Sequence, residues 1–192
     1  LSTGNVISTL CPPPPPAPAP FTDTHSHWAI DYAYSKGIIH GMTDTTFVPD
    51  GTVTKGQFAT MIVNATGLPT AKTEDGAHWA QTYADAAKEA GLIDENIAFE
   101  TTADLDAPIT REEMTSIMVH AIEYRHGRIP SVILMPIDDM LTFDDTDNIS
   151  DWAVDDVKKA MKRKIISGFE DNTFRPKETA TRAQAAVMIT RL

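Results

Sequence analysis

The sequence repeats one pattern three times, and this repeat limits the possible folds more than any other feature. Each copy opens with a tryptophan, and its second half opens with a threonine: Trp28 and Thr54, Trp79 and Thr110, and Trp152 and Thr181. The spacing between the two residues differs among the copies, which indicates two fixed elements joined by a variable loop. A copy of this size cannot bury an apolar face alone, so we expect the three copies to pack together.

The second element of each copy is predicted to be an α-helix. Its threonine and the residue three positions later form the capping-box pattern, in which two side chains satisfy free backbone amides: Thr54 and Gln57, Thr110 and Glu113, and Thr181 and Gln184. Apolar residues follow on one helical face, four, seven, eight and eleven positions after each threonine. Gly67 stands where the first of these helices would end in a left-handed residue.

The first element of each copy is also predicted to be a helix that begins at the tryptophan. It ends at one of three residues: Gly37, Gly91 and Lys164. In copies one and three a loop follows over residues 41–49 and 168–176, and its first residue, Gly41 or Gly168, is expected to adopt the positive φ of a tight turn. Each copy is therefore predicted to be helix, structured loop and helix, which makes the fold all-α.

The chain is acidic, with a formal net charge of -11 and a pI of about 4.8. This balance argues against nucleic acid or an anionic membrane as a partner held by bulk electrostatics, and no apolar run is long enough to span a bilayer. The single cysteine, Cys11, excludes an internal disulfide and a Cys-rich zinc site. Residues 11–20 are typical of a polyproline II spacer. The opening residues show neither an initiator Met nor a signal pattern, so we expect the chain to be part of a longer protein.

Lys55, Arg111 and Arg182 each follow the capping threonine, at the first helical position. The helix dipole makes a cation there unfavourable by about 0.3–1 kcal/mol, so its recurrence needs a reason. One interpretation is an anion site, in which exposed helix amides and a guanidinium hold a carboxylate. The other interpretation is an ion pair with an acidic residue of a neighbouring copy. The residues alone leave both interpretations open.

A tryptophan at a helix start is most often a packing residue, although one face of its ring could line a sugar pocket. His25, His27 and His78 precede two of the tryptophans, but no cysteine or HExxH pattern supports zinc, so no metal or other cofactor is predicted. The acidic stretch 143–155 lacks the glycine and glutamate of an EF-hand and is predicted to be a solvated turn. No nucleophile-elbow, Walker A or dinucleotide-binding pattern occurs, so we do not predict an enzyme.

Residues 21–63 and 143–189 resemble the S-layer homology (SLH) domain family. Both carry Phe-x-Asp, a Trp-Ala helix, a loop with Phe-x-Pro, and a threonine-cation pair that opens the second helix. The resemblance, which extends in diverged form to the middle copy, implies a pseudo-threefold helical bundle with ligand grooves between neighbouring repeats. It also implies that the chain anchors an exported protein non-covalently to the bacterial cell wall. The family's ligand is a secondary cell wall polymer, commonly with a ketal-linked pyruvate on a terminal amino sugar.

The resemblance assigns the grip on the acidic sugar to the cation that follows the threonine. The predicted polymer-binding set adds the tryptophans and two loop glycines: Lys55, Arg111, Arg182, Trp28, Trp79, Trp152, Gly41 and Gly168. Copy one departs from the family at Lys55, which lacks the guanidinium fork, and at Gly56, which is expected to weaken the helix start. Copy two has lost the Gly…Phe-x-Pro loop. We therefore expect the three grooves to differ.

The predicted organisation is a tail and Pro-rich linker over residues 1–20, repeat 1 over 21–70, repeat 2 over 71–128, and repeat 3 with its preceding crossing segment over 129–192. The expected location is outside the cell, at the cell surface in the wall or S-layer. The expected partners are the wall polymer or a peptidoglycan-linked glycan, and an upstream effector region of the same chain. The alternative function is a helical protein–protein assembly module without glycan binding, in which the first-turn cations form ion pairs.

Overall fold

The structure is a computed structural model that describes residues 17–25, 27–127 and 141–192. Its helices are α1 (Trp28–Ser35), α2 (Lys55–Thr66), α3 (Gln81–Glu89), α4 (Thr102–Asp106), α5 (Arg111–His126), the 3-10 helix η2 (Thr146–Asn148), α6 (Val154–Lys162) and α7 (Arg182–Ile189). Within these described ranges there is no β-strand, which confirms the all-α class. Most of the predicted linker, including Cys11, and the crossing segment 128–140 lie outside the described residues.

The second-element helices begin where the capping boxes predict. In α2, α5 and α7 the threonine hydroxyl accepts from the backbone amide three residues later, and the glutamine or glutamate side chain accepts from the threonine amide. Gly67 ends α2 with a φ of 72°, as expected. Of the first-element helices, α1 begins at its tryptophan, whereas α3 and α6 begin two residues after theirs. The short helix α4 was not predicted, although Thr101 and Asp104 form a capping box of their own.

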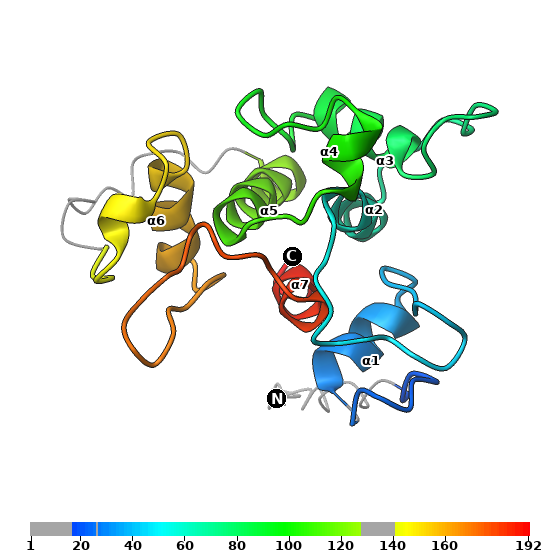
Figure 1. The fold of residues 1–192 in the computed structure, drawn as a ribbon, viewed down its shortest axis with the longest axis horizontal. Helices are drawn as coiled ribbons and strands as arrows, with labels where there is room; N and C mark the ends of the chain where they lie inside the picture. The colour runs from blue at the N-terminus through cyan, green and yellow to red at the C-terminus, as the bar shows by residue number, and fades with distance from the viewer. Residues whose placement is uncertain (1–16, 26, 128–140) are drawn as a thin grey trace, which may run out of the picture.

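The helices pair between repeats. The second helix of each repeat packs against the first helix of the next, as α2 with α3 and α5 with α6. The last helix, α7, packs against the first, α1, and so closes a ring of three lobes. In Figure 1 the helices α2, α5 and α7 lie at the centre and α1, α3 and α6 lie outside them. This closed arrangement agrees with the pseudo-threefold bundle that the resemblance implies.

Backbone hydrogen bonds join the three repeats at the centre. Val53, Ile109 and Ala180, each directly before a capping threonine, bond in a cycle: Ile109 N donates to Val53 O (3.1 Å), Ala180 N to Ile109 O (3.0 Å), and Val53 N to Ala180 O (3.1 Å). All three residues are buried. Since buried amides and carbonyls need partners, this cycle fixes the starts of α2, α5 and α7 relative to one another.

Each repeat contributes one fully buried loop phenylalanine, Phe47, Phe99 or Phe174. In repeats 1 and 3 an aspartate of the same repeat fixes this loop. The Asp23 carboxylate accepts from the amides of Phe47 (2.9 Å) and Val48 (2.7 Å). These backbone hydrogen bonds lower the pKa of Asp23. Asp145 accepts in the same way in repeat 3, so the acidic stretch 143–155 contains a loop-fixing aspartate and is not simply a solvated turn.

The predicted reason for the loop glycines, a positive φ, is wrong. Gly41 and Gly168 do not have positive φ; a non-glycine residue does, at Val48 (59°) and its counterpart Arg175 (58°). A Cβ on Gly168 would lie 2.4 Å from the Phe143 ring, and one on Gly41 would lie 2.5 Å from the ring of Phe21. Glycine is therefore required because an aromatic ring packs directly against the backbone, and at Gly41 a Cβ would also lie 2.2 Å from the carbonyl oxygen of Thr43.

Candidate ligand groove

The three first-turn cations lie at equivalent places, each between its own helix and the loop of the next repeat. We call these places junction 1/2 (Lys55), junction 2/3 (Arg111) and junction 3/1 (Arg182). The side chains donate to loop carbonyls: Lys55 Nζ to Ala98 (3.2 Å), Arg111 Nε to Phe174 (2.8 Å) and Arg182 Nε to Phe47 (2.8 Å). The three residues are 7%, 9% and 5% exposed. The repeat thus recurs in the site as well as in the fold.

The helix amides beside these cations are already used. The amides of Lys55, Arg111 and Arg182 donate to the carbonyls of Ala107, Glu178 and Gly51 in the next repeat, at 2.9, 2.9 and 2.8 Å. In α5 and α7 the next amide also donates across the junction, and the third is held by the capping threonine. At α5 and α7 the hypothesis that exposed helix amides bind an anion is therefore wrong. Any anion site here depends on side chains.

At junction 3/1 each of the three guanidinium nitrogens of Arg182 already donates one hydrogen bond to the protein. Arg182 Nη2 donates to His40 O at 2.9 Å, and Nη1 donates to Gln57 Oε1 at 3.3 Å. The guanidinium carbon also lies 4.4 Å from the centroid of the Phe47 ring. Burial lowers the pKa of Arg182, and the charge of Asp23 opposes this shift. Arg182 therefore acts first as a structural residue that ties repeat 3 to the loop of repeat 1.

Junction 1/2 is neutralised by an ion pair. Lys55 Nζ lies 2.8 Å from Glu113 Oε1, and both side chains are largely buried. Glu113 is also the capping residue of α5, where its carboxylate accepts from Thr110. The ion-pair interpretation of the first-turn cations is thus correct at this junction. An anionic ligand would have to displace Glu113 to reach Lys55.

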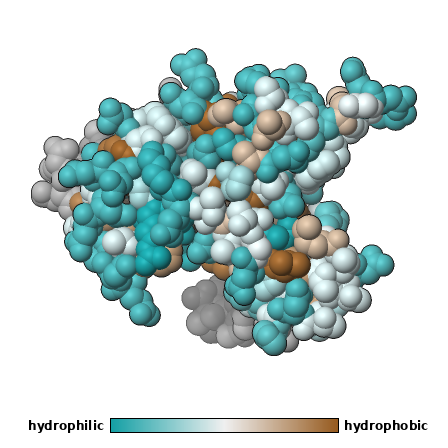
Figure 2. Space-filling view, viewed as in Figure 1, coloured by the Kyte–Doolittle hydropathy of each residue, from teal (hydrophilic) through white to brown (hydrophobic). Residues whose placement is uncertain are grey.

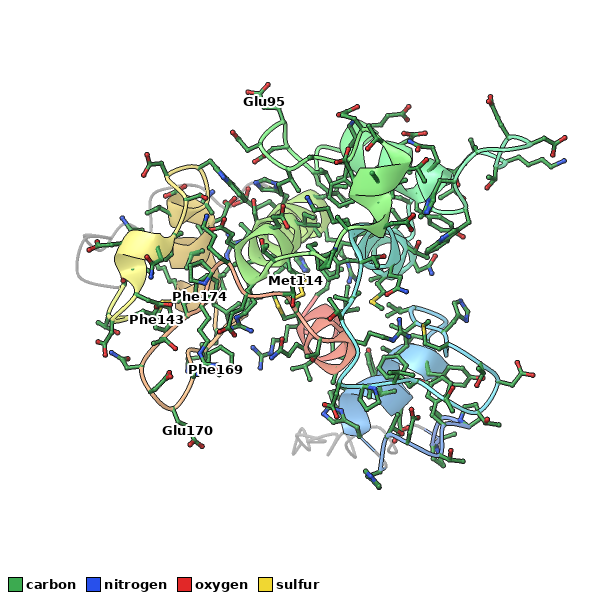
Figure 3. All side chains as sticks on the ribbon, in the orientation of Figure 1. Glu95, Met114, Phe143, Phe169, Glu170 and Phe174 are labelled. Carbon is green, nitrogen blue, oxygen red and sulfur yellow. The ribbon has the colours of Figure 1, made fainter. Side chains whose placement is uncertain are left out.

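Junction 2/3 differs from both. Apart from the Nε bond to Phe174, the Arg111 side chain makes no hydrogen bond and no ion pair with any residue that the structure describes. Its guanidinium carbon lies 4.6 Å from the centroid of the Phe169 ring and 5.3 Å from that of Phe174. Figure 3 shows these two rings, with Phe143, gathered in the region between α6 and α7. Burial lowers the pKa of Arg111, and the charge of Glu178 opposes this shift. An arginine stays charged at neutral pH, so Arg111 presents a desolvated cation without a carboxylate partner.

Arg111 also lines a groove of about 260 Å³. The other polar residues of the groove are Ser167 from the repeat 3 loop, Gln184 and Arg191 from the α7 region, and His27 from the start of α1. Apolar side chains complete the lining: Ile165, Ile166, Ala183, Val187 and Met188. Sequence reasoning missed Gln184 and Arg191 as site residues. Their positions in the repeat carried the signal, since Gln184 is the capping residue of α7 and Arg191 stands where Asn64 and His120 stand in the other copies.

The tryptophans do not gather at this groove. Trp28 is 57% exposed and stacks on Tyr32, and Trp79 is 51% exposed beside His78. Only Trp152 packs partly against the core. The prediction that tryptophans at helix starts are mainly packing residues is therefore wrong for two of the three. Their exposed rings, like the glycines Gly41 and Gly168, remain predicted polymer contacts outside the groove lining.

Two of the histidines that precede the tryptophans have defined surroundings. His78 pairs with Asp106 at 3.1 Å, and His27 lines the groove. Over residues 17–25, 27–127 and 141–192, no group of three or more His, Cys, Asp or Glu side chains could hold a metal ion. In the same ranges, none of the helices combines the length and apolar character needed to cross a membrane.

Comparison with known proteins shows which family the chain resembles. The S-layer homology domain matches residues 20–59 and 142–186, which lie in copies one and three. An amylopullulanase of Thermoanaerobacterium thermosulfurigenes and the exoglucanase XynX of Acetivibrio thermocellus are each 35% identical over 87% of this chain. An S-layer protein of Bacillus thuringiensis subsp. finitimus is 25% identical over 85% of it. The chain spans only 9%, 16% and 20% of the lengths of these three proteins.

The middle copy falls outside the matched segments, but the structure gives it the same capped helix, buried loop phenylalanine and place in the ring. The motifs, the closed all-α ring and the matched segments agree, and the chain belongs to the S-layer homology family.

Proposed function

We propose that this chain anchors an exported protein to the bacterial cell wall by binding an acidic secondary cell wall polymer at junction 2/3. One observation carries this proposal. Arg111 is buried, has no carboxylate partner among the described residues, and lines a groove. Two parallel hydrogen bonds from a guanidinium to a carboxylate are stronger and more directional than bonds between neutral groups.

The lining of the groove supports a pyruvylated sugar as the ligand. A ketal-linked pyruvate carries a carboxylate and a methyl group on the same carbon atom. At junction 2/3 a cation and apolar side chains occur together: Arg111 can hold the carboxylate, and Ile166, Val187 or Met188 can contact the methyl group. Ser167 and Gln184 offer polar atoms for sugar hydroxyls. A simple inorganic anion would leave the apolar part of the groove unused.

The family supports a cell-surface location, as expected, because a relative that matches most of the chain is an S-layer protein. Two other relatives have different names, an amylopullulanase and an exoglucanase, yet both contain the same segment. A segment shared by these proteins does not account for either activity, so we assign it attachment and no reaction. The attached cargo is then the rest of a longer protein.

The alternative, a helical protein–protein module, has less support. Figure 2 shows a mainly hydrophilic face with small, separate apolar patches, whereas assembly surfaces are usually larger and continuous. An ion pair between repeats, one of the two kinds that this alternative expected, does occur between Lys55 and Glu113. It accounts for junction 1/2 and leaves junction 2/3 unexplained.

Two measurements test the proposal. The first is co-sedimentation of the chain with purified cell walls before and after chemical removal of the secondary polymer. The second is calorimetric titration with a pyruvylated amino sugar and with the same sugar lacking the pyruvate. We expect binding to intact walls and to the pyruvylated sugar only. Equal binding to stripped walls, or to both sugars, would show that the acidic polymer is not the ligand.

A further inference from the structure

We propose that Phe169 is a positioning residue, which holds the guanidinium of Arg111 in place while leaving its nitrogens free for an acidic ligand. This inference rests on the proposed function and extends it to a residue outside the predicted set. The Arg111 guanidinium carbon lies 4.6 Å from the centroid of the Phe169 ring. A cation is attracted to the face of an aromatic ring without donating a directional hydrogen bond to it.

Comparison with junction 3/1 shows why this matters. There the Arg182 guanidinium is held by hydrogen bonds to His40 and Gln57, which use one N–H of each Nη. The residue equivalent to Phe169 in that loop is Met42, which is 55% exposed. Both guanidiniums also lie against the buried phenylalanine of the facing loop, Phe47 or Phe174, so the junctions differ in the second ring, Phe169, and in the Nη acceptors. The face of Phe169 leaves all four N–H groups of the Arg111 Nη nitrogens available, whereas the carbonyl and amide acceptors at junction 3/1 occupy one N–H of each Nη.

The Phe169 ring is itself fixed before any ligand arrives. Its backbone closes a tight turn, in which Phe169 N donates to Thr173 O at 2.8 Å and Asn172 N donates to Phe169 O at 3.0 Å. On the same ring lies a second guanidinium, that of Arg175, at 4.0 Å from the centroid.

Arg175 is in turn anchored within this loop. Its Nη2 donates to Asp171 at 2.8 Å, and its Nε donates to Thr173 at 3.1 Å. Hydrogen bonds from Thr173 and Arg175 lower the pKa of Asp171 to about 2, so this anchor stays ionised at neutral pH. A ring held in this way reduces the ordering that ligand binding would otherwise require.

The test compares variants of Phe169 by calorimetric titration with the pyruvylated amino sugar. Phe169→Leu keeps an apolar side chain and removes the aromatic face, and we expect it to weaken binding about tenfold, within the range for a desolvated cation–π contact. Phe169→Tyr restores the face and should bind within about twofold of wild type. Met42→Leu, the equivalent change at junction 3/1, is the matched control and should leave affinity unchanged. The melting temperature of each variant is measured alongside.

The outcomes separate this inference from the function on which it rests. If wild type fails to bind the sugar, the proposed function fails. If wild type binds, Arg111→Ala abolishes binding, and Phe169→Leu binds as wild type does, the function stands and the positioning role is overturned. If Phe169→Leu does not fold, Phe169→Met, which copies the residue of junction 3/1, takes its place. Equal loss of affinity in Phe169→Leu and Phe169→Tyr would also overturn the role, because it would show a requirement for shape alone.

Discussion

Lys55 and Arg111 occupy the same position in α2 and α5, yet their surroundings differ in charge. Lys55 faces Glu113, the capping residue of the next repeat, at 2.8 Å. The capping residue that shares the groove with Arg111 is Gln184. Glutamate and glutamine serve the cap equally well, but only glutamate neutralises a cation from the neighbouring repeat. A single atom type at the third helical position therefore decides whether a junction is closed by an ion pair or open to an anion.

The loops reinforce this difference. Where junction 2/3 has Ser167 and Gly168, the equivalent loop of repeat 2 has Asp94 and Glu95. These carboxylates would repel an acidic sugar, although they do not alter the helical frame. The comparison teaches that the repeats preserve the elements of the fold while the charges at each junction vary. Four predictions test it, from the largest expected effect to the smallest.

The largest effect should be on stability at the closed junction. Lys55→Ala leaves the Glu113 carboxylate buried without its cation, and we expect the free energy of unfolding to fall by about 3 kcal/mol. Arg111→Ala removes a buried cation that has no carboxylate partner among the described residues, so its cost should be less than about 1.5 kcal/mol, near that of one hydrogen bond. Urea unfolding followed by circular dichroism measures both. Equal costs would mean that the two junctions do not differ as described.

The second effect concerns binding to the wall, which Arg111→Ala should weaken more than Lys55→Ala. Arg111→Ala removes the proposed carboxylate contact and should weaken attachment to purified walls about a hundredfold, or about 2.7 kcal/mol. Lys55→Ala, compared at a temperature where it remains folded, should change attachment less than about threefold, under 0.7 kcal/mol. Co-sedimentation over a range of wall concentrations gives both values. A larger loss in Lys55→Ala would move the binding site to junction 1/2.

A double substitution should convert the closed junction toward the open one. Lys55→Arg with Glu113→Gln restores the guanidinium and keeps the capping box while removing the ion pair. We expect a second, weaker site for the pyruvylated sugar, about tenfold or 1.4 kcal/mol below the first, because Asp94 and Glu95 remain. Calorimetric stoichiometry would rise from one toward two. A folded double variant with unchanged stoichiometry would show that neutralisation by Glu113 is not what closes the junction.

The smallest expected effect is a pH dependence of stability that arises from the contact between α5 and α6. His120 Nε2 lies 3.2 Å from Asp156 Oδ2, and the same oxygen accepts from the Ser116 hydroxyl at 2.6 Å. In the other two lobes a tyrosine occupies the position of Asp156. The hydrogen bond to Asp156 raises the pKa of His120. Burial alone would raise the pKa of Asp156, but the hydrogen bonds from His120 and Ser116 outweigh it, and the pKa is lowered.

The sign of the pH effect follows from these directions. The His120 contribution is complete below pH 6.5, the ordinary value, and is lost as pH rises through the raised folded value. The Asp156 contribution is present above pH 3.8 and is lost as pH falls through the lowered folded value. Melting temperature should therefore be highest between these limits and decline on the alkaline side. His120→Asn should flatten that alkaline decline, and an unchanged slope would assign it to other groups.

Much of the frame could be predicted because it depends on local chemistry. The capping boxes and the helical periodicity located α2, α5 and α7, and the same boxes located the three cations. The pairing of α1 with α7 could not be predicted from the helical periodicity, because periodicity identifies a buried face but not the helix that covers it. Gly56 shows the same limit. It was expected to weaken the helix start, but a Cβ there would lie 2.9 Å from that of Ala80, so glycine permits close packing of α2 on repeat 2.

The candidate site divides in the same way. The cations were predicted, but their differing partners were not, because Glu113 reaches Lys55 from the next repeat and not from within its own. Phe169 was missed because its contact with Arg111 joins a loop to the first residue of α5, which lies far away in the sequence. The pattern of one repeat cannot indicate which side chains of another repeat it will meet.

The cycle of backbone hydrogen bonds through Val53, Ile109 and Ala180 makes the three repeats depend on one another. A fragment with two repeats would leave one donor and one acceptor of the cycle unsatisfied in an apolar setting, and it would also lack the helix that covers α1 or α7. Such a fragment has no smaller ring available to it. Shortening this module should therefore produce either unfolded chains or oligomers in which the missing third is borrowed from another molecule.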